Sequence, residues 1–492
     1  MRVVLPQQLQ LGQSDIAAIQ FDVRSRDDIP QILQGLQFIY VTPDLRAAVF
    51  KILEGLVPEG ISGDRGRPGM DLWKAFVLSV LRVNLNMDYD RLHELANQHR
   101  TLRQILGHGL RDDGDEYKLQ TIKDNAGLVD EASLEHINRL VVEAGHAPVK
   151  KNETTPLKAR CDSFVVETNV HYPTDTNLLW DAIRCALRTI GHCGEARQVS
   201  DWRQWRYNSK KVKKALRHTQ KLRHSTSKKP QQQARRQQAI REAYETYLEL
   251  SAGYLTRMEA TLAGWGVAEV AAPGTQEAAL KDWIAAGWKQ IDLIRRRVLE
   301  GEKIPHQDKV FSLFEPHTEW LSKGKVGVPV ELGLNVGVME ASTGFILHHK
   351  VMQQCTDSEV AVDIVKEAQR RFPQLASCSF DQGFHSPDNQ KQLAELLDQV
   401  VLPRKGKRST VHQAAENDPE FVQARRQHAA VESGINALEV HGLDRCPDRG
   451  LEHFKRYVAL AVVGRNLQKL GAILQAQALK KLQRQERRRP VA

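Results

Sequence analysis

The sequence predicts an α/β protein in which a long helical segment interrupts a β-sheet core. Three observations support this prediction. Residues 160–168 have the short apolar and β-branched side chains of a buried strand. Residues 178–304 then follow a helical pattern throughout. Strand-like alternation resumes at Val328, where six apolar residues occupy alternate positions up to Val338.

Composition sets broad limits on the function. The chain has 492 residues, which allows two to four domains, and 41% of them are hydrophobic. The sequence has no apolar run long enough to form a membrane-spanning helix, and its first residues lack the apolar core of a signal peptide. We therefore expect a cytoplasmic protein. The formal net charge of +10 favours a polyanionic partner. The six cysteines form no Cys-x-x-Cys pair, so we expect reduced thiols and no zinc site.

Helical patterns dominate the N-terminal region, residues 1–147. An amphipathic segment begins at Pro43 and a strongly apolar one at Met70, and further helical segments follow near Tyr89 and Tyr117. These patterns predict an all-helical N-terminal domain. Recognition of DNA ends or dimerisation is one use for it, and a plain helical bundle is the other, because spacing this loose does not define a helix-turn-helix.

Asp162 lies inside the predicted first strand. An ionised carboxylate resists burial unless a partner compensates its charge, and a divalent metal ion is one such partner. The alternative is a solvated aspartate at the strand edge. Glu167 is on the same strand, but the odd separation of five residues places it on the opposite face.

A second carboxylate, Asp381, ends a short apolar segment. Gly383 follows it as a turn residue, and Ser386 with Pro387 is typical of a helix start, with serine as the cap. An aspartate at the carboxyl end of a strand lies where α/β folds place their chemistry.

A third carboxylate, Glu432, falls in a predicted helix over residues 425–439. Apolar residues form one face of this helix, and a neighbouring polar face carries Arg425, His428, Glu432 and Glu439. Two aspartates and a glutamate provide hard oxygen ligands, which suit Mg²⁺ or Mn²⁺.

Basic residues are concentrated in residues 202–241, which contain fourteen Lys or Arg and no Asp or Glu. Solvated helices normally mix the two signs, since like charges on one face repel. The run therefore favours phosphate neutralisation over a merely solvated face. The residues of this segment that we expect to contact DNA are Lys210, Lys211, Lys213, Lys214 and Arg217. A basic loop with Lys405 and Lys407 presents the same two alternatives.

The remaining pattern gives the order β, β, β, α, β, α, β, α from the first strand onward. A strand begins at Phe345, a helix capped by Asp or Ser begins near Asp357, and a short strand covers residues 399–402. An amphipathic helix closes the pattern at residues 454–471, and we expect the basic residues 480–489 after it to be frayed.

Five phrases of the sequence together resemble the DDE catalytic core of bacterial insertion-sequence transposases, especially the ISNCY-type group. They recur in the expected order at residues 162–175, 314–325, 380–386, 402–407 and 428–432. The resemblance implies a ribonuclease-H-like core with the helical segment inserted after its first strand. The predicted parts are the N-terminal domain (1–147), the two core segments (157–177 and 305–471), the basic helical insertion (178–304) and a basic C-terminal tail (472–492).

The resemblance implies a DNA transposase that binds inverted-repeat ends, cuts with Mg²⁺ or Mn²⁺ and joins the 3′ ends to target DNA. By analogy, Asp162 would bridge two metal ions, and Asp381 and Glu432 would each hold one. We expect a nucleoid-associated homodimer or higher oligomer, since two ends must be processed together. The alternatives are a ribonuclease-H-like nuclease without strand transfer and a non-catalytic DNA-binding protein derived from a transposase.

The sequence departs from one pattern found in such enzymes. Some carry a tyrosine and an arginine seven and four residues before the glutamate and a lysine seven after it; here these positions hold Arg425, His428 and Glu439. We expect Arg425, Arg426 and His428 to supply part of the phosphate contact instead. Glu439 is a rival third ligand, and Asp175 is a further carboxylate after the first strand.

Overall fold

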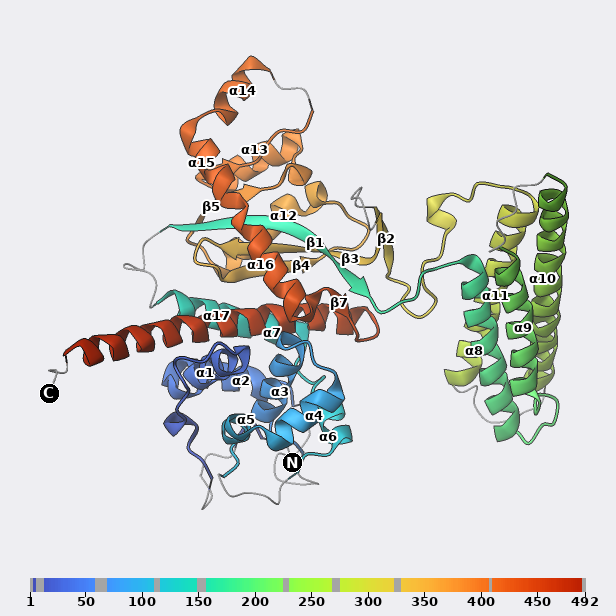
Figure 1. The fold of residues 1–492 in the computed structure, drawn as a ribbon, viewed down its shortest axis with the longest axis horizontal. Coiled ribbons are helices and arrows are strands. Elements are labelled where there is room, and N and C mark those ends of the chain that lie inside the picture. The colour runs from blue at the N-terminus through green and yellow to red at the C-terminus, as the bar shows by residue number, and fades with distance from the viewer. Residues whose placement is uncertain are drawn as a thin grey trace. The chain divides into compact units, whose positions relative to one another are not determined.

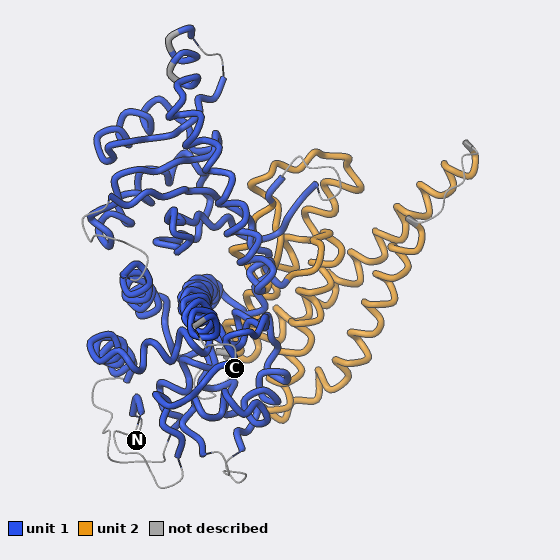
Figure 2. The backbone as a smooth tube through the Cα atoms, turned by 60° about the vertical axis from the view of Figure 1, so that its left-hand side comes forward, with its two compact units in different colours: residues 1–169, 321–492 blue, residues 170–320 orange. Residues whose placement is uncertain are grey.

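The protein forms two compact units in this computed structural model: residues 1–169 with 321–492, and residues 170–320 (Figure 2). The structure describes residues 3–5, 13–57, 69–109, 116–147, 156–223, 230–267, 275–322, 329–406 and 409–488. The first unit holds the sheet and the N-terminal helices, and the second is mainly helical. Among the described helices, none has the length and apolar character needed to cross a membrane.

The sheet is mixed, which confirms the predicted α/β class. Its order is β2-β3-β1-β5-β6, with β4 also paired to β3 and β7 to β1. β1 runs antiparallel to β3 and parallel to β5, and β5 runs parallel to β6. The strands are β1 (Leu157–Thr168), β2 (Glu319–Ser322), β3 (Val330–Ala341), β4 (Ile346–Val351), β5 (Leu375–Phe380), β6 (Gln399–Val401) and β7 (Arg445–Cys446). β2 and β7 are short strands that the sequence pattern did not predict.

Helices cover both faces of this sheet (Figure 1). Gly337 of β3 faces α12, because a Cβ on it would lie 2.9 Å from Cδ1 of Ile364. Glu340, three residues on, points to the opposite face. There a Cβ on Gly434 of α16 would collide with the Glu340 carboxylate. The helices of this half of the chain are α12 (Asp357–Arg371), α13 (Pro387–Leu396), α14 (Thr410–Glu416), α15 (Pro419–His428), α16 (Ala430–Leu438) and α17 (Leu451–Arg488).

The N-terminal helices pack around α17. Gly35 of α1 and Gly471 of α17 allow the backbones to approach closely, because a Cβ on either would collide with a carbonyl group of the other helix. The predicted helical segments are present. Their bounds are α1 (Asp28–Val41), α2 (Pro43–Glu54), α3 (Leu72–Asn84), α4 (Tyr89–Gln98), α5 (Arg100–Ile105), α6 (Leu119–Asn125) and α7 (Glu131–His146).

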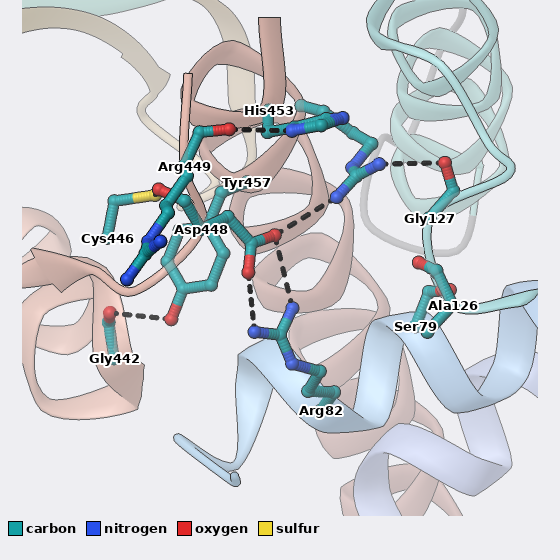
Figure 3. A network of polar contacts seen from close by, with 11 residues as sticks. Ser79, Arg82, Ala126, Gly127, Gly442, Cys446, Asp448, Arg449, His453 and Tyr457 are labelled. Carbon is teal, nitrogen blue, oxygen red and sulfur yellow. Dashed lines mark hydrogen bonds and ion pairs between the residues drawn. The ribbon is translucent and has the colours of Figure 1, made fainter. Parts of the chain in front are cut away.

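A buried polar network joins α3 to the start of α17 (Figure 3). Arg82 donates to both carboxylate oxygens of Asp448, at 3.2 and 2.6 Å. Arg456 donates to the same carboxylate at 3.0 Å and to the Gly127 carbonyl at 2.7 Å. Burial alone would raise the pKa of Asp448, but the two arginines outweigh it and hold the pKa below its ordinary value. The N-terminal helices are thereby tied to the C-terminal one.

The predicted fraying after residue 480 is wrong for the part of the tail that the structure describes. α17 continues without a break to Arg488. This stretch is rich in Ala, Gln, Leu and Lys, which are strong helix formers. Leu474 packs against the core, and Gln475 donates to the Ser25 carbonyl at 2.9 Å. Tertiary contacts therefore extend the helix beyond the predicted end at residue 471.

The second unit has an apolar core of its own, which includes Trp202, Tyr247 and Leu255. The predicted basic run begins just before α9 and continues into α10. On α9, Val212 and Leu216 are buried. The helices of this unit are α8 (Asp175–Ala196), α9 (Trp205–Arg223), α10 (Pro230–Val267) and α11 (Thr275–Ile294).

Candidate functional site

The register of the sheet places Asp162 beside Asp381. β1 pairs in parallel with β5, and the last pair is Cys161 with Phe380. The residue after each of these is an aspartate, Asp162 after Cys161 and Asp381 after Phe380. Neighbouring strands are about 4.8 Å apart. β5 ends at Phe380, so Asp381 stands at its carboxyl end and is exposed. Two of the three predicted carboxylates therefore start from adjacent backbone positions.

The third predicted carboxylate, Glu432, lies exposed in the first turn of α16. Val431, Ile435 and Leu438 are buried, as the sequence pattern predicted. This apolar face holds α16 against the sheet, where the helix contacts β1. Glu432 thus comes from a different layer of the fold than the two aspartates.

The pKa of Asp162 reports how these groups act on one another. This pKa is raised from an ordinary 3.8 to about 6, and burial is the largest cause. The backbone N–H of Ser163 donates to Asp162 Oδ1 at 2.8 Å and opposes the rise. The negative charges of Asp381, Asp357 and Glu432 add to it. The predicted carboxylates are therefore close enough to repel the ionised form of Asp162.

The donor set suits a hard divalent cation. Among the residues that the structure describes, no three His, Cys, Asp or Glu side chains are grouped closely enough to hold a metal ion as they lie. The charged side chains that act on Asp162 are all carboxylates, and a cation would relieve their mutual repulsion. Binding would require these carboxylates to lie closer together than they do here.

Asp357 is a further carboxylate whose charge acts on Asp162, and the sequence reasoning missed it. We expected an Asp or Ser to cap α12, but the cap is Thr356, whose N–H donates to Glu359 at 2.7 Å. The spacing of Thr356 and Glu359 is that of a capping box, and this signal identifies the cap from sequence alone. Asp357 is then not needed as the cap. Its Oδ1 accepts a hydrogen bond from Ser163 Oγ at 2.6 Å.

Arg160 is a second residue that the sequence reasoning missed. It lies two positions before Asp162, so both side chains point to the same face of β1. It borders a small cavity of about 40 Å³, together with Ser379 and Gln427. The sequence contained a signal for Arg160, because a basic residue two positions from a candidate metal ligand on the same strand lies on the same face of the sheet.

His428 is hydrogen-bonded within the site. Its Nδ1 lies 3.0 Å from Ser379 Oγ. Burial lowers the pKa of His428 and Arg160 lowers it further, whereas Asp381 and Glu432 oppose the fall. The lowered pKa favours the neutral imidazole, so a contact of His428 with DNA would be a hydrogen bond and not an ion pair.

The other predicted DNA-contacting residues are exposed wherever the structure describes them. Arg425 and Arg426 lie on α15, and Lys405 follows β6. Lys407 lies outside the described residues. The exposed basic residues on α9 are Lys210, Lys211, Lys213, Lys214 and Arg217.

The single helix predicted over residues 425–439 is wrong. α15 ends at His428 and α16 begins at Ala430. Ala429 interrupts the helical hydrogen-bond pattern. Its N–H donates to the Gln427 carbonyl and not to the carbonyl four residues earlier. Glu439 begins the π-helical segment Glu439–Leu443, which directly follows α16.

The remaining rival carboxylates have other surroundings. Asp175 forms an ion pair with Arg297 at 2.8 Å inside the second unit. Glu167 is on β1 at odd separation from Asp162, which places it on the opposite face.

No protein-family model, curated protein or solved structure matches the chain.

Proposed function

We propose that the protein is a DDE-type DNA transposase that uses Asp162, Asp381 and Glu432 as its metal-binding carboxylates. The observation that carries the proposal is the parallel register of β1 and β5, which puts Asp162 beside Asp381, where the charge of Glu432 also acts on Asp162. Structural ion-pair networks also perturb pKa values, but every charged side chain that shifts the pKa of Asp162 is a carboxylate and none is a cation, so these charges do not form such a network.

The connectivity of the sheet supports a ribonuclease-H-like core. β1, β3 and β4 follow one another as antiparallel neighbours. β5 and β6 then continue the sheet on the other side of β1, parallel to it. The second unit, residues 170–320, follows directly after β1 in the sequence. The resemblance places an insertion at this position.

DNA is the partner that the charge distribution supports. The exposed basic residues of α9 follow one another on a helix whose buried side is apolar. Such a surface binds phosphate by releasing counterions, whatever the base sequence. A homodimer or higher oligomer belongs to the same proposal, because two transposon ends must be held together.

Each group of the chain then has a defined task. Asp162, Asp381 and Glu432 would hold Mg²⁺ or Mn²⁺, which supplies activation of the nucleophile and stabilisation of the leaving oxygen. Asp162 is mostly ionised above pH 6, which suits it to cation binding near neutral pH. The exposed Lys405, Arg425 and Arg426, with Lys407, would bind the phosphates of the substrate strand.

The test is strand cleavage by purified Asp162→Asn. We expect DNA binding to remain and Mg²⁺-dependent cutting to disappear. Asp363→Asn is the matched control, because Asp363 lies on α12 with its side chain 62% exposed. Undiminished cutting by the Asp162 variant would refute the assignment.

A second arm separates the proposal from its alternatives. The wild-type protein receives a donor DNA with a free 3′-hydroxyl, a target plasmid and Mg²⁺ or Mn²⁺. Joined products support the transposase, and nicks without joining favour a nuclease. DNA binding with no metal-dependent cutting at any pH favours a non-catalytic DNA-binding protein.

A further inference from the structure

We propose that Asp357 is a positioning residue, which holds the backbone segments that carry Asp162 and Asp381 in the arrangement needed to bind a divalent cation. This inference rests on the proposed function. It assigns a role to a carboxylate that lies outside the Asp, Asp, Glu set.

The first contact joins Asp357 to the strand that bears Asp162. Ser163 Oγ donates to Asp357 Oδ1 at 2.6 Å. The backbone N–H of the same Ser163 donates to Asp162 Oδ1 at 2.8 Å. Ser163 therefore links the two carboxylates, with its side chain on one and its backbone on the other.

The second contact joins Asp357 to the turn that follows Asp381. A Cβ on Gly383 would lie 2.9 Å from Asp357 Oδ2, so the carboxylate rests against the glycine backbone. Asn389 links the same two segments independently of Asp357. Its side-chain amide donates to the Ser358 carbonyl at 2.6 Å and to the Phe384 carbonyl at 2.8 Å. The start of α12 and the turn after β5 are thereby held together.

The charge of Asp357 is not explained by the fold alone. Thr356 and Glu359 already cap α12, so its N-terminus gains only modestly from a further acidic residue. Against this, the charge of Asp357 acts unfavourably on Asp162. An asparagine would keep an acceptor for Ser163 without that repulsion. A cation bound beside Asp162 gives the negative charge a favourable role.

The experiment is a calorimetric titration of Mn²⁺ into the full-length, metal-free protein without DNA. Asp357→Ala removes both the hydrogen bond and the charge, and we expect at least about tenfold weaker Mn²⁺ binding, as for groups that orient metal ligands. Asp357→Asn keeps an acceptor and should weaken binding less, whereas Asp357→Glu should restore part of the affinity. Asp363→Asn, on the exposed side of α12, should bind as the wild type does.

Ser163→Ala keeps the test decisive if Asp357→Ala fails to fold, because it deletes the same hydrogen bond from the other side and should also weaken Mn²⁺ binding. Wild-type affinity in a folded Asp357→Ala or Ser163→Ala variant would overturn the positioning role, whatever the change in melting temperature. Failure of the proposed function looks different. In that case wild-type protein binds no Mn²⁺, or Asp162→Asn binds it equally well.

Discussion

Replacing Asp162 with asparagine should stabilise the metal-free protein at neutral pH. Burial, with the neighbouring carboxylates adding to it, raises the pKa of Asp162 from 3.8 to about 6. A raised carboxyl pKa means that the folded state binds the proton more tightly than the unfolded state does. Stability from this group is therefore present at low pH, falls as the pH rises from about 4 to about 6, and stays low above that.

The magnitude follows from the same values. One pKa unit corresponds to about 1.4 kcal/mol, so a rise of about two units corresponds to about 3 kcal/mol. Solvent reaches part of the side chain and screens the charges, which reduces the expected effect to about 2 kcal/mol. Asparagine does not titrate and keeps an oxygen for the Ser163 N–H. Asp162→Asn should therefore be more stable than wild type by about 2 kcal/mol at pH 7.5 and equally stable at pH 4.

The assay is urea denaturation of both proteins across this pH range in excess chelator, with Asp363→Asn as control. A second series in Mg²⁺ should stabilise only the wild type, because a bound cation removes the repulsion. A variant that is less stable than wild type at pH 7.5, or whose advantage persists unchanged at pH 4, would refute the electrostatic reasoning.

Three further predictions concern the rest of the molecule. Asp448→Ala leaves two buried arginines without their shared partner and should lower the free energy of unfolding by about 3–5 kcal/mol, measured by urea denaturation; a loss below 1 kcal/mol would contradict this. Gly471→Ala places a Cβ against the Gln31 carbonyl and should cost about 1–3 kcal/mol; an unchanged melting temperature would show that α1 and α17 separate easily. The double variant Lys210→Glu, Lys214→Glu should weaken DNA binding for all sequences and reduce the slope of log affinity against log salt by about two, by fluorescence anisotropy. A slope equal to that of the wild type would exclude these lysines from the interface.

Local pattern was sufficient for the elements that carry the site. The apolar residues before Asp381 and around Asp162 predict their strands, and the spacing of Val431 and Ile435 predicts the buried face of α16. The pairing of β1 with β5 lies beyond such patterns, because strand register between distant segments depends on tertiary packing. Asp162 and Asp381 could be singled out as carboxylates, but their adjacency comes from that register.

Two features that the sequence pattern missed, the break at Ala429 and the extension of α17, lie beyond local signals. The break at Ala429 occurs without glycine or proline, so no local signal marks it. The extension of α17 to Arg488 depends partly on contacts with the N-terminal region. Asp357 differs from these, because the capping-box spacing of Thr356 and Glu359 in the sequence already identifies the cap of α12.

The insertion after β1 has a consequence for how the chain folds during synthesis. Cys161 pairs with Met339 across the sheet, so β1 leaves the ribosome well before the strands on either side of it exist. The helical unit has an apolar core of its own and can collapse in the interval. Contacts between segments this distant in sequence form slowly. Until β3 and β5 are made, β1 is an unpaired apolar strand and is prone to aggregate. We therefore expect newly made protein to depend on chaperones until β3 and β5 have emerged.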